Sequence, residues 1–130
     1  MRSHLSATFE VKSWEESAFD EQENLPKLTR ALVTRAYSGD IEGSSTTEWL
    51  MAYAEDGSAT FVGLERFVGQ VGGHKGTLVL QHVGSYAEGA AKAKLVVIEG
   101  ANSGSLKSAT GDGDFVANPS GSVTLDLVLN

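Results

Sequence analysis

Residues 41–71 read IEGSSTTEWLMAYAEDGSATFVGLERFVGQV, two runs rich in β-branched, aromatic and small residues on either side of Asp56-Gly57. Polar and apolar residues alternate along both runs, a period of two that is typical of strands and not of helices. Asp-Gly is a favoured dipeptide for a two-residue hairpin turn. This stretch therefore predicts two long antiparallel strands joined by a tight turn.

The same alternation recurs along the rest of the chain. Further strand-like segments lie at 5–12, 27–38, 75–87, 90–98 and 123–129, and the stretch TGDGDFVA precedes the last of them. Residues 15–26 are acidic without alternation, which predicts an exposed loop, and residues 118–121 predict a turn. About eight strands at hairpin spacing predict an all-β fold, an eight-stranded antiparallel barrel with an internal cavity, and a two-sheet sandwich is the alternative.

The composition predicts a single soluble domain over residues 1–130. Hydrophobic residues make up 41% of the chain and charged residues 21%, the fractions of an ordinary globular protein. The net charge of −7 argues against binding to nucleic acid or to acidic membranes. Because there is no cysteine and the histidines lack ligand spacing, we expect no metal site. We expect no cofactor either, because the acid–base chemistry considered below needs none. The first residues do not resemble a signal peptide and no apolar run is long enough to span a membrane, so we expect a cytoplasmic protein.

The hairpin turns also predict which residues face each other, because loop length fixes strand register. If Asp56-Gly57 is a two-residue turn, Glu48 lies directly opposite Glu65. If Gly73-His74 is the next one, Glu65 lies opposite His82. The sequence thus predicts a row of two carboxylates and one imidazole across three neighbouring strands.

This row is expected to face the barrel interior, because the other face of the same strands carries Lys92 and Lys94, which belong in water. A further turn at Glu88-Gly89 places His82 beside Leu95. The ligand-binding candidates on the row's own face are Leu50, Phe61, Phe67, Leu80 and Tyr86. The outer face is expected to carry Arg66 and the apolar residues Trp49, Val62, Leu64, Val68 and Val83, which predict a partner surface and a homo-oligomer, a dimer or higher.

Two carboxylates and a histidine on an apolar wall are the setting of general acid–base chemistry. Facing carboxylates repel, so one of them is expected to keep its proton to a raised pH, or His82 to be charged between them. The Ser38-Gly39-Asp40 turn places either Arg30 or Ala31 opposite Glu48, and an inward Arg30 would be the counter-ion. The alternative is a buried polar network that only stabilises the barrel.

Three runs, KLTRALVTRAYSGDIEGSSTTEWLMAY, FVGLERFVGQVGGHKGTLVLQHVG and GSLKSATGDGDF, make the sequence similar to a bacterial family of small proteins of unknown function. That family is related in fold to the allene oxide cyclases, and the likeness extends from TFEVKSW to the last strand. The resemblance implies an eight-stranded, calycin-like barrel with an internal cavity, often in an oligomer. It implies no reaction, and no catalytic residue of the cyclases is carried over to this chain.

The leading functional hypothesis is a cavity protein that binds a small, largely apolar or amphipathic ligand with a polar group and catalyses a cyclase- or isomerase-like step. Glu48 and Glu65 would be acid and base, and His82 would tune or shuttle the proton. The first alternative is a lipocalin-like carrier or sensor without turnover. The second is a structural oligomer whose interior is closed by side chains.

Overall fold

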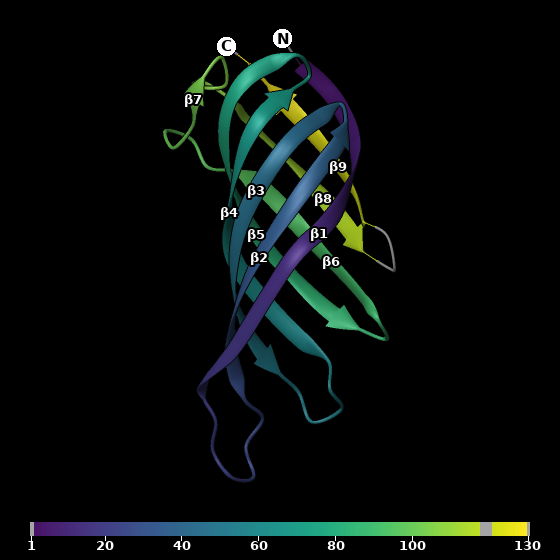
Figure 1. The fold of residues 1–130 in the computed structure, drawn as a ribbon, viewed down its shortest axis with the longest axis vertical. Coiled ribbons are helices and arrows are strands. Elements are labelled where there is room, and N and C mark those ends of the chain that lie inside the picture. Colours follow the sequence, from purple (N-terminus) through teal and green to yellow (C-terminus); the bar gives the residue numbers. More distant parts are fainter. Residues whose placement is uncertain (1, 118–120, 130) are drawn as a thin grey trace.

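The computed structural model describes residues 2–117 and 121–129, and these residues form an antiparallel sheet that closes on itself (Figure 1). The strands are β1 (Arg2–Asp20), β2 (Leu28–Gly39), β3 (Ile41–Tyr53), β4 (Ala59–Val71), β5 (His74–Ala87), β6 (Ala90–Val97), β7 (Ser103–Gly104), β8 (Thr110–Ala117) and β9 (Gly121–Val128). No helix in the described part of the chain is long and apolar enough to cross a membrane.

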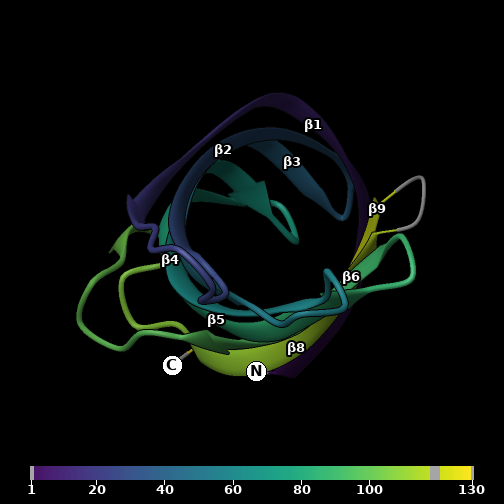
Figure 2. The same cartoon turned by 90° about the horizontal axis from the view of Figure 1, so that it is seen from below.

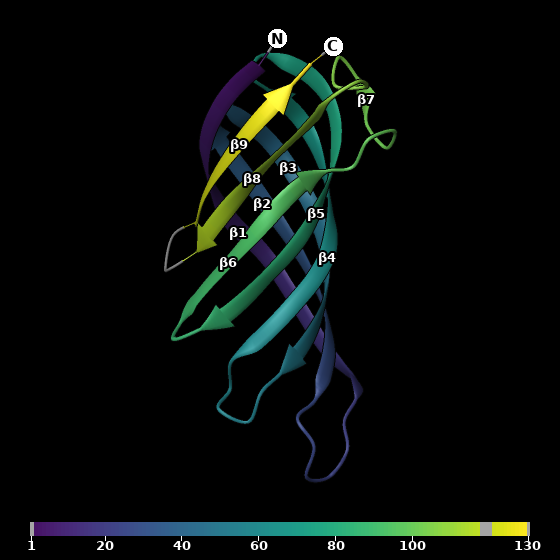
Figure 3. The ribbon, with the colours of Figure 1, turned by 180° about the vertical axis from the view of Figure 1, so that it is seen from behind.

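The sheet order is β4-β3-β2-β1-β9-β8-β6-β5-β7, and a further pairing of β4 with β5 closes the barrel. Eight strands build the wall, while the two-residue β7 adds to the edge of β5. The view along the barrel shows this closed ring, and the view from behind shows β6, β8 and β9 crossing it obliquely (Figures 2 and 3). The predicted all-β, eight-stranded antiparallel barrel is confirmed.

The first strand is much longer than the sequence predicts. Residues 15–20, expected in a loop, continue β1 because they pair with Leu28–Leu32 of β2, and register shifts lie between Val11 and Ser13 and between Ala18 and Asp20. The β1–β2 hairpin consequently extends below the rest of the barrel (Figure 1). The turn predicted at 118–121 lies, apart from Gly121, outside the described residues.

The β3–β4 hairpin differs from the predicted register by one residue. The backbone N–H of Ala54 donates to the carbonyl of Ser58 across the turn, and the Asp56 carboxylate accepts bonds from both the backbone N–H and the hydroxyl of Ser58. Gly57 takes the positive φ of +89° that this longer turn needs. Because side chains alternate between faces, a shift of one residue turns every side chain of β3 to the other side of the wall.

The next two hairpins keep the predicted faces. The β4–β5 turn is Gly72-Gly73 and not Gly73-His74, a change of two in register that leaves Glu65 and His82 facing inward, with Leu80 opposite Glu65. The β5–β6 turn is the predicted Glu88-Gly89, in which both residues have positive φ, and His82 lies opposite Leu95 as expected.

The end of the barrel that holds the termini is filled with aliphatic side chains. Leu106 and Ala109, from the connection between β7 and β8, are fully buried against this core. The space between the inward side chains there amounts to about 10 Å³, bounded by apolar residues such as Ile41, Leu78 and Leu125. The internal ligand cavity expected from the sequence is therefore not shown.

Candidate functional site

A chain of hydrogen-bonded polar side chains crosses the middle of the barrel. The indole Nε1 of Trp49 donates to Nδ1 of His82 at 3.1 Å, and Nε2 of His82 lies 2.8 Å from Oε1 of Glu65. The hydroxyl of Tyr37 donates to the other carboxylate oxygen, Oε2, at 2.5 Å. These residues come from β2, β3, β4 and β5, so the network ties half of the barrel wall together.

The partners of His82 fix where its proton lies. An indole N–H can only donate, so Nδ1 of His82 must be the acceptor and carry no proton. The ring proton therefore lies on Nε2 and is donated to Glu65, which leaves the imidazole neutral. A charged His82 would have to give up its bond from Trp49.

Glu65 is ionised in this setting. Burial by itself raises the pKa of its carboxyl, but the hydrogen bond from His82, the charge of Arg35 and the positive charge that His82 can take up lower it to about 2. The hydroxyl of Ser45 also lowers this pKa, from a position outside hydrogen-bonding geometry. The expectation that a carboxyl in this row holds its proton to a raised pH is wrong, because the second carboxylate, Glu48, is not there.

The counter-charge is Arg35, which is 2% exposed. Its guanidinium lies in the corner of two aromatic rings that meet edge to face, with Cζ 4.1 Å from the centroid of Phe9 and 4.4 Å from that of Phe115. Its Nη1 donates to the Tyr37 hydroxyl at 3.4 Å, so Tyr37 links the cation to the Glu65 carboxylate. Burial and the Glu65 charge raise the pKa of Tyr37, which keeps its proton for this bond.

Three buried polar atoms beside this network have no hydrogen-bond partner among the described residues: Nε of Arg35, Oγ of Ser45 and Oγ1 of Thr47. Their residues are neighbours on the inner face of the wall, because Ser45 faces Arg35 across β2 and β3, and Thr47 follows two positions later on the same side of β3. Buried polar groups in proteins are almost always bonded, so three together indicate a place for a hydrogen-bonding atom from outside the chain.

The structure separates the predicted site residues. Glu65 and His82 lie together inside, and the ligand-binding candidates Phe61, Phe67 and Leu80 are buried on the same inner face. Tyr86 lies on that face at the open end of the barrel and is 40% exposed. Arg66 is exposed, as expected.

The predicted interior positions of Glu48, Arg30 and Leu50 are wrong. All three side chains point outward, because the turn between β3 and β4 is one residue longer than expected and the SGD turn places Leu32, not Arg30 or Ala31, opposite Glu48. Arg30 is still the partner of Glu48, at 3.2 Å, but in water on the outer surface. Leu50 is 45% exposed beside them.

Sequence reasoning missed Arg35 and Tyr37 and placed Trp49 on the outer face. A usable signal lay in β3, where one face carries Trp49, Met51 and Tyr53 and the other carries Glu48, Leu50 and Ala52. The bulkier and more apolar set belongs inside. The same choice in β2 would have placed Arg35 and Tyr37 inside with Val33.

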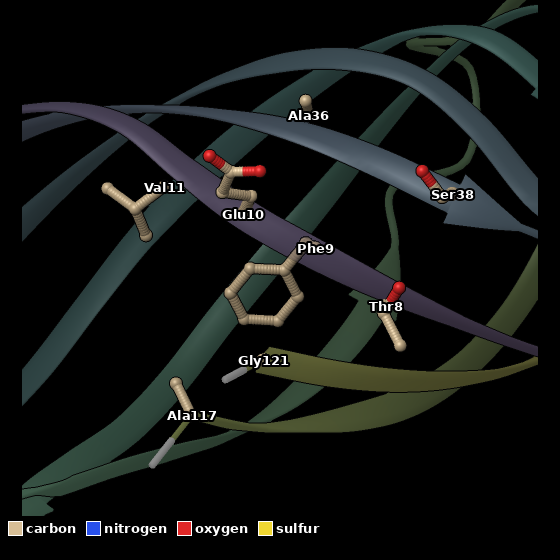
Figure 4. A pocket seen from close by; sticks show the side chains of 8 residues that line it. All are labelled: Thr8, Phe9, Glu10, Val11, Ala36, Ser38, Ala117 and Gly121. Atoms are coloured by element: carbon tan, nitrogen blue, oxygen red, sulfur yellow. The ribbon is translucent and has the colours of Figure 1, made fainter. Parts of the chain in front are cut away.

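A recess of about 650 Å³ lies beside β1, next to the polar network (Figure 4). The buried Phe9 and the half-exposed Val11 form part of its lining, together with Thr8, Glu10, Ala36, Ser38, Ala117 and Gly121. Phe9 connects the recess with the interior because its ring also covers the Arg35 guanidinium, and Val11 is the direct cross-strand neighbour of Arg35. Ligand sites in proteins have volumes of a few hundred to about 1,000 Å³.

The lowered pKa of Glu65 predicts a specific acid sensitivity. A carboxyl whose pKa falls from 4.5 to about 2 on folding stabilises the fold above the higher value. This stabilisation, about 3 kcal/mol, is lost as the pH falls from about 5 to about 2. In urea titrations, the difference in free energy of unfolding between the wild type and Glu65→Gln should shrink by that amount over this range. A difference that stays constant with pH would contradict the ionised state, and Glu48→Gln is the control.

These features define a class: a closed antiparallel β-barrel with a buried, charge-balanced polar network and a recess beside it. The chain belongs to the family described as "Protein of unknown function (DUF3224)", whose model matches residues 5–129. It is similar to the crystal structure of a DUF3224 protein of unknown function from Shewanella oneidensis MR-1, with 25% identity and a TM-score of 0.84 over 100% of this chain and 99% of that one.

Among curated proteins, none matches this chain. The resemblance to a family of unknown function is confirmed. The relation to allene oxide cyclases appears in neither matching description and stays a prediction.

Proposed function

We propose that this barrel binds a small, largely apolar molecule with one polar group, and that it does so without turnover. The observation that carries the proposal is the set of three partnerless polar atoms on Arg35, Ser45 and Thr47, of which Arg35 packs against the Phe9 ring that lines the recess. The apolar body of the ligand would occupy the recess. Its polar group would reach the partnerless atoms past the Phe9 ring.

An acid–base enzyme of the cyclase or isomerase kind is the second candidate, favoured by the buried contact between His82 and Glu65. Both nitrogens of His82 and both carboxylate oxygens of Glu65 already have partners, so proton transfer to a ligand requires one of these bonds to break. Glu48 takes no part because it lies outside. Binding without turnover requires none of these hydrogen bonds to break, and we therefore favour it over catalysis.

Self-association is a separate part of the proposal. Val62, Leu64, Val68 and Val83 are each 50–55% exposed on the outer wall of β4 and β5. An apolar surface of this kind favours contact with a second copy of the chain. Sedimentation velocity would test it.

The binding proposal is tested with N-phenyl-1-naphthylamine, a neutral apolar fluorescent probe. We expect saturable binding with one probe per chain, accompanied by quenching of Trp14 and Trp49, whose rings lie 5.4 Å apart near the site. Val11→Lys, which puts a charge into the recess lining, should weaken binding at least about tenfold, a loss of about 1.4 kcal/mol.

The matched control is Leu64→Lys, which makes the same kind of change at a residue 55% exposed on the outer wall of β4. It should bind the probe like the wild type. Native mass spectrometry of protein purified from cells should in addition find a bound small molecule. If the probe does not saturate, or both variants bind equally well, the recess is not a binding site and the structural alternative is favoured.

A further inference from the structure

The charge balance of the interior restricts the chemistry of any ligand that reaches it. Among the buried side chains of the described residues, those that can carry charge are Arg35, Glu65 and His82. Arg35 is a permanent cation, and the bond from Trp49 keeps His82 neutral. Glu65 supplies the one matching negative charge, so the interior is neutral before anything binds.

An incoming carboxylate would disturb this balance. The charge of Arg35 already offsets that of Glu65, so a second anion would be buried without a cation of its own, and an uncompensated buried charge costs several kcal/mol. Protonation of His82 would restore neutrality only by breaking its bond from Trp49, which leaves the buried indole N–H without an acceptor.

The partnerless atoms favour a ligand group other than a carboxylate. Arg35 Nε carries an N–H that can only donate, and the hydroxyls of Ser45 and Thr47 can each donate a proton as well. Three unpaired donors on neighbouring residues suit an oxygen that accepts hydrogen bonds. A carbonyl oxygen meets this need and brings no net charge.

We propose, on the basis of the binding function above, that the ligand's polar group is an uncharged carbonyl, as in a ketone, amide or ester. Its oxygen accepts hydrogen bonds from Arg35 Nε and from the hydroxyls of Ser45 and Thr47. The Phe9 and Phe115 rings, which meet edge to face beside the guanidinium, supply apolar surface next to it. The site therefore selects neutral carbonyl compounds over carboxylates of the same shape.

The test uses four probes that share a phenyl ring on a short chain: 4-phenylbutan-2-one, 3-phenylpropanamide, 3-phenylpropanoate and butylbenzene. Affinities for the intact protein are measured by calorimetry at pH 7.5. We expect the ketone and the amide to bind at least about tenfold more tightly than the carboxylate, which corresponds to one good hydrogen bond or more. Butylbenzene should bind more weakly than the ketone, because it leaves the three donors unpaired.

Measurement of proton uptake shows whether the carboxylate probe binds as an anion or together with a proton. Calorimetry in two buffers of different ionisation enthalpy should show that 3-phenylpropanoate binds only with uptake of a proton, so that the occupied interior stays neutral. Binding of the carboxylate as tightly as the ketone, without proton uptake, would overturn the proposal.

A pair of threonine variants locates the carbonyl. Thr47→Val removes a buried, partnerless hydroxyl and keeps the side-chain volume, so the protein should fold as well as before, and its affinity for the ketone should fall about tenfold relative to butylbenzene. Thr46→Val, on the exposed face of the same strand, is the control and should change neither affinity. Equal affinity of Thr47→Val and wild type for the ketone would count against the assignment.

The outcomes separate this inference from the function on which it rests. If N-phenyl-1-naphthylamine and all four probes fail to bind, the binding function itself is wrong. If the naphthylamine and butylbenzene bind but the ketone gains nothing over butylbenzene, the barrel binds apolar molecules and the carbonyl site is wrong.

Discussion

Replacing Glu65 by leucine is expected to lower the free energy of unfolding by about 3–5 kcal/mol at neutral pH. The carboxylate is fully buried and is the acceptor for both Tyr37 and His82. Its loss leaves the Arg35 cation buried without a counter-charge and leaves two donors without an acceptor. Equilibrium urea unfolding followed by tryptophan fluorescence measures the change.

The double variant Arg35→Met/Glu65→Leu tests the reason for this loss. Removing both charges leaves no uncompensated ion, so the double variant should lose less stability than the two single variants added together, by about 1–3 kcal/mol. Additive losses would mean that the two residues do not balance each other's charge. Glu48→Gln is the control, because the Glu48–Arg30 pair lies in water and such pairs contribute about 0–1 kcal/mol.

The barrel could be predicted from the sequence because its evidence is spread over many residues. Alternation along each strand and a turn signal at each junction point to the same fold, so no single error changes the result. β1 shows the limit of this reasoning. Its residues 15–20 lack alternation and are mostly exposed, and they are held in a strand by pairing with β2, which is a tertiary effect.

The prediction of the site depended on the placement of single residues, and the length of one turn, between β3 and β4, decided whether that placement was right. Asp-Gly occurs in two-residue and in longer hairpin loops. The Asp56 carboxylate binds Ser58 and thereby selects the longer turn, a local competition that the dipeptide alone does not reveal. Glu88-Gly89 formed the expected turn, and the change of two residues at Gly72-Gly73 left the faces as they were, so His82 was placed correctly and Glu48 was not.

The sequence did not indicate Arg35 as a site residue, for a different reason. A buried arginine is rare without a counter-charge, and its counter-charge, Glu65, lies on β4, two strands away across the sheet. No spacing within β2 indicates that partner. Only the closed barrel brings Arg35, Tyr37 and Glu65 to one place, so a register error in β3 was enough to leave the network out of the sequence-based site.

Trp49→Ala should be the most direct test of the observed register, with an expected loss of about 3–5 kcal/mol in the free energy of unfolding. Trp49 is 2% exposed, and its ring lies 4.6 Å from that of Phe61 and 6.2 Å from that of Phe115, centroid to centroid. Its indole also donates the bond that fixes the proton of His82. Truncation therefore removes core packing and leaves Nδ1 of His82 unpaired.

The neighbouring residue provides the matched control. Glu48→Ala removes an exposed side chain and should cost about 0–1 kcal/mol. A two-residue turn at Asp56-Gly57 would reverse this order, because it places Glu48 inside and Trp49 in water. Urea unfolding of the two variants side by side thus decides between the registers: a larger loss for Glu48→Ala than for Trp49→Ala would contradict the three-strand contact of Trp49, Glu65 and His82 on which the proposed site depends.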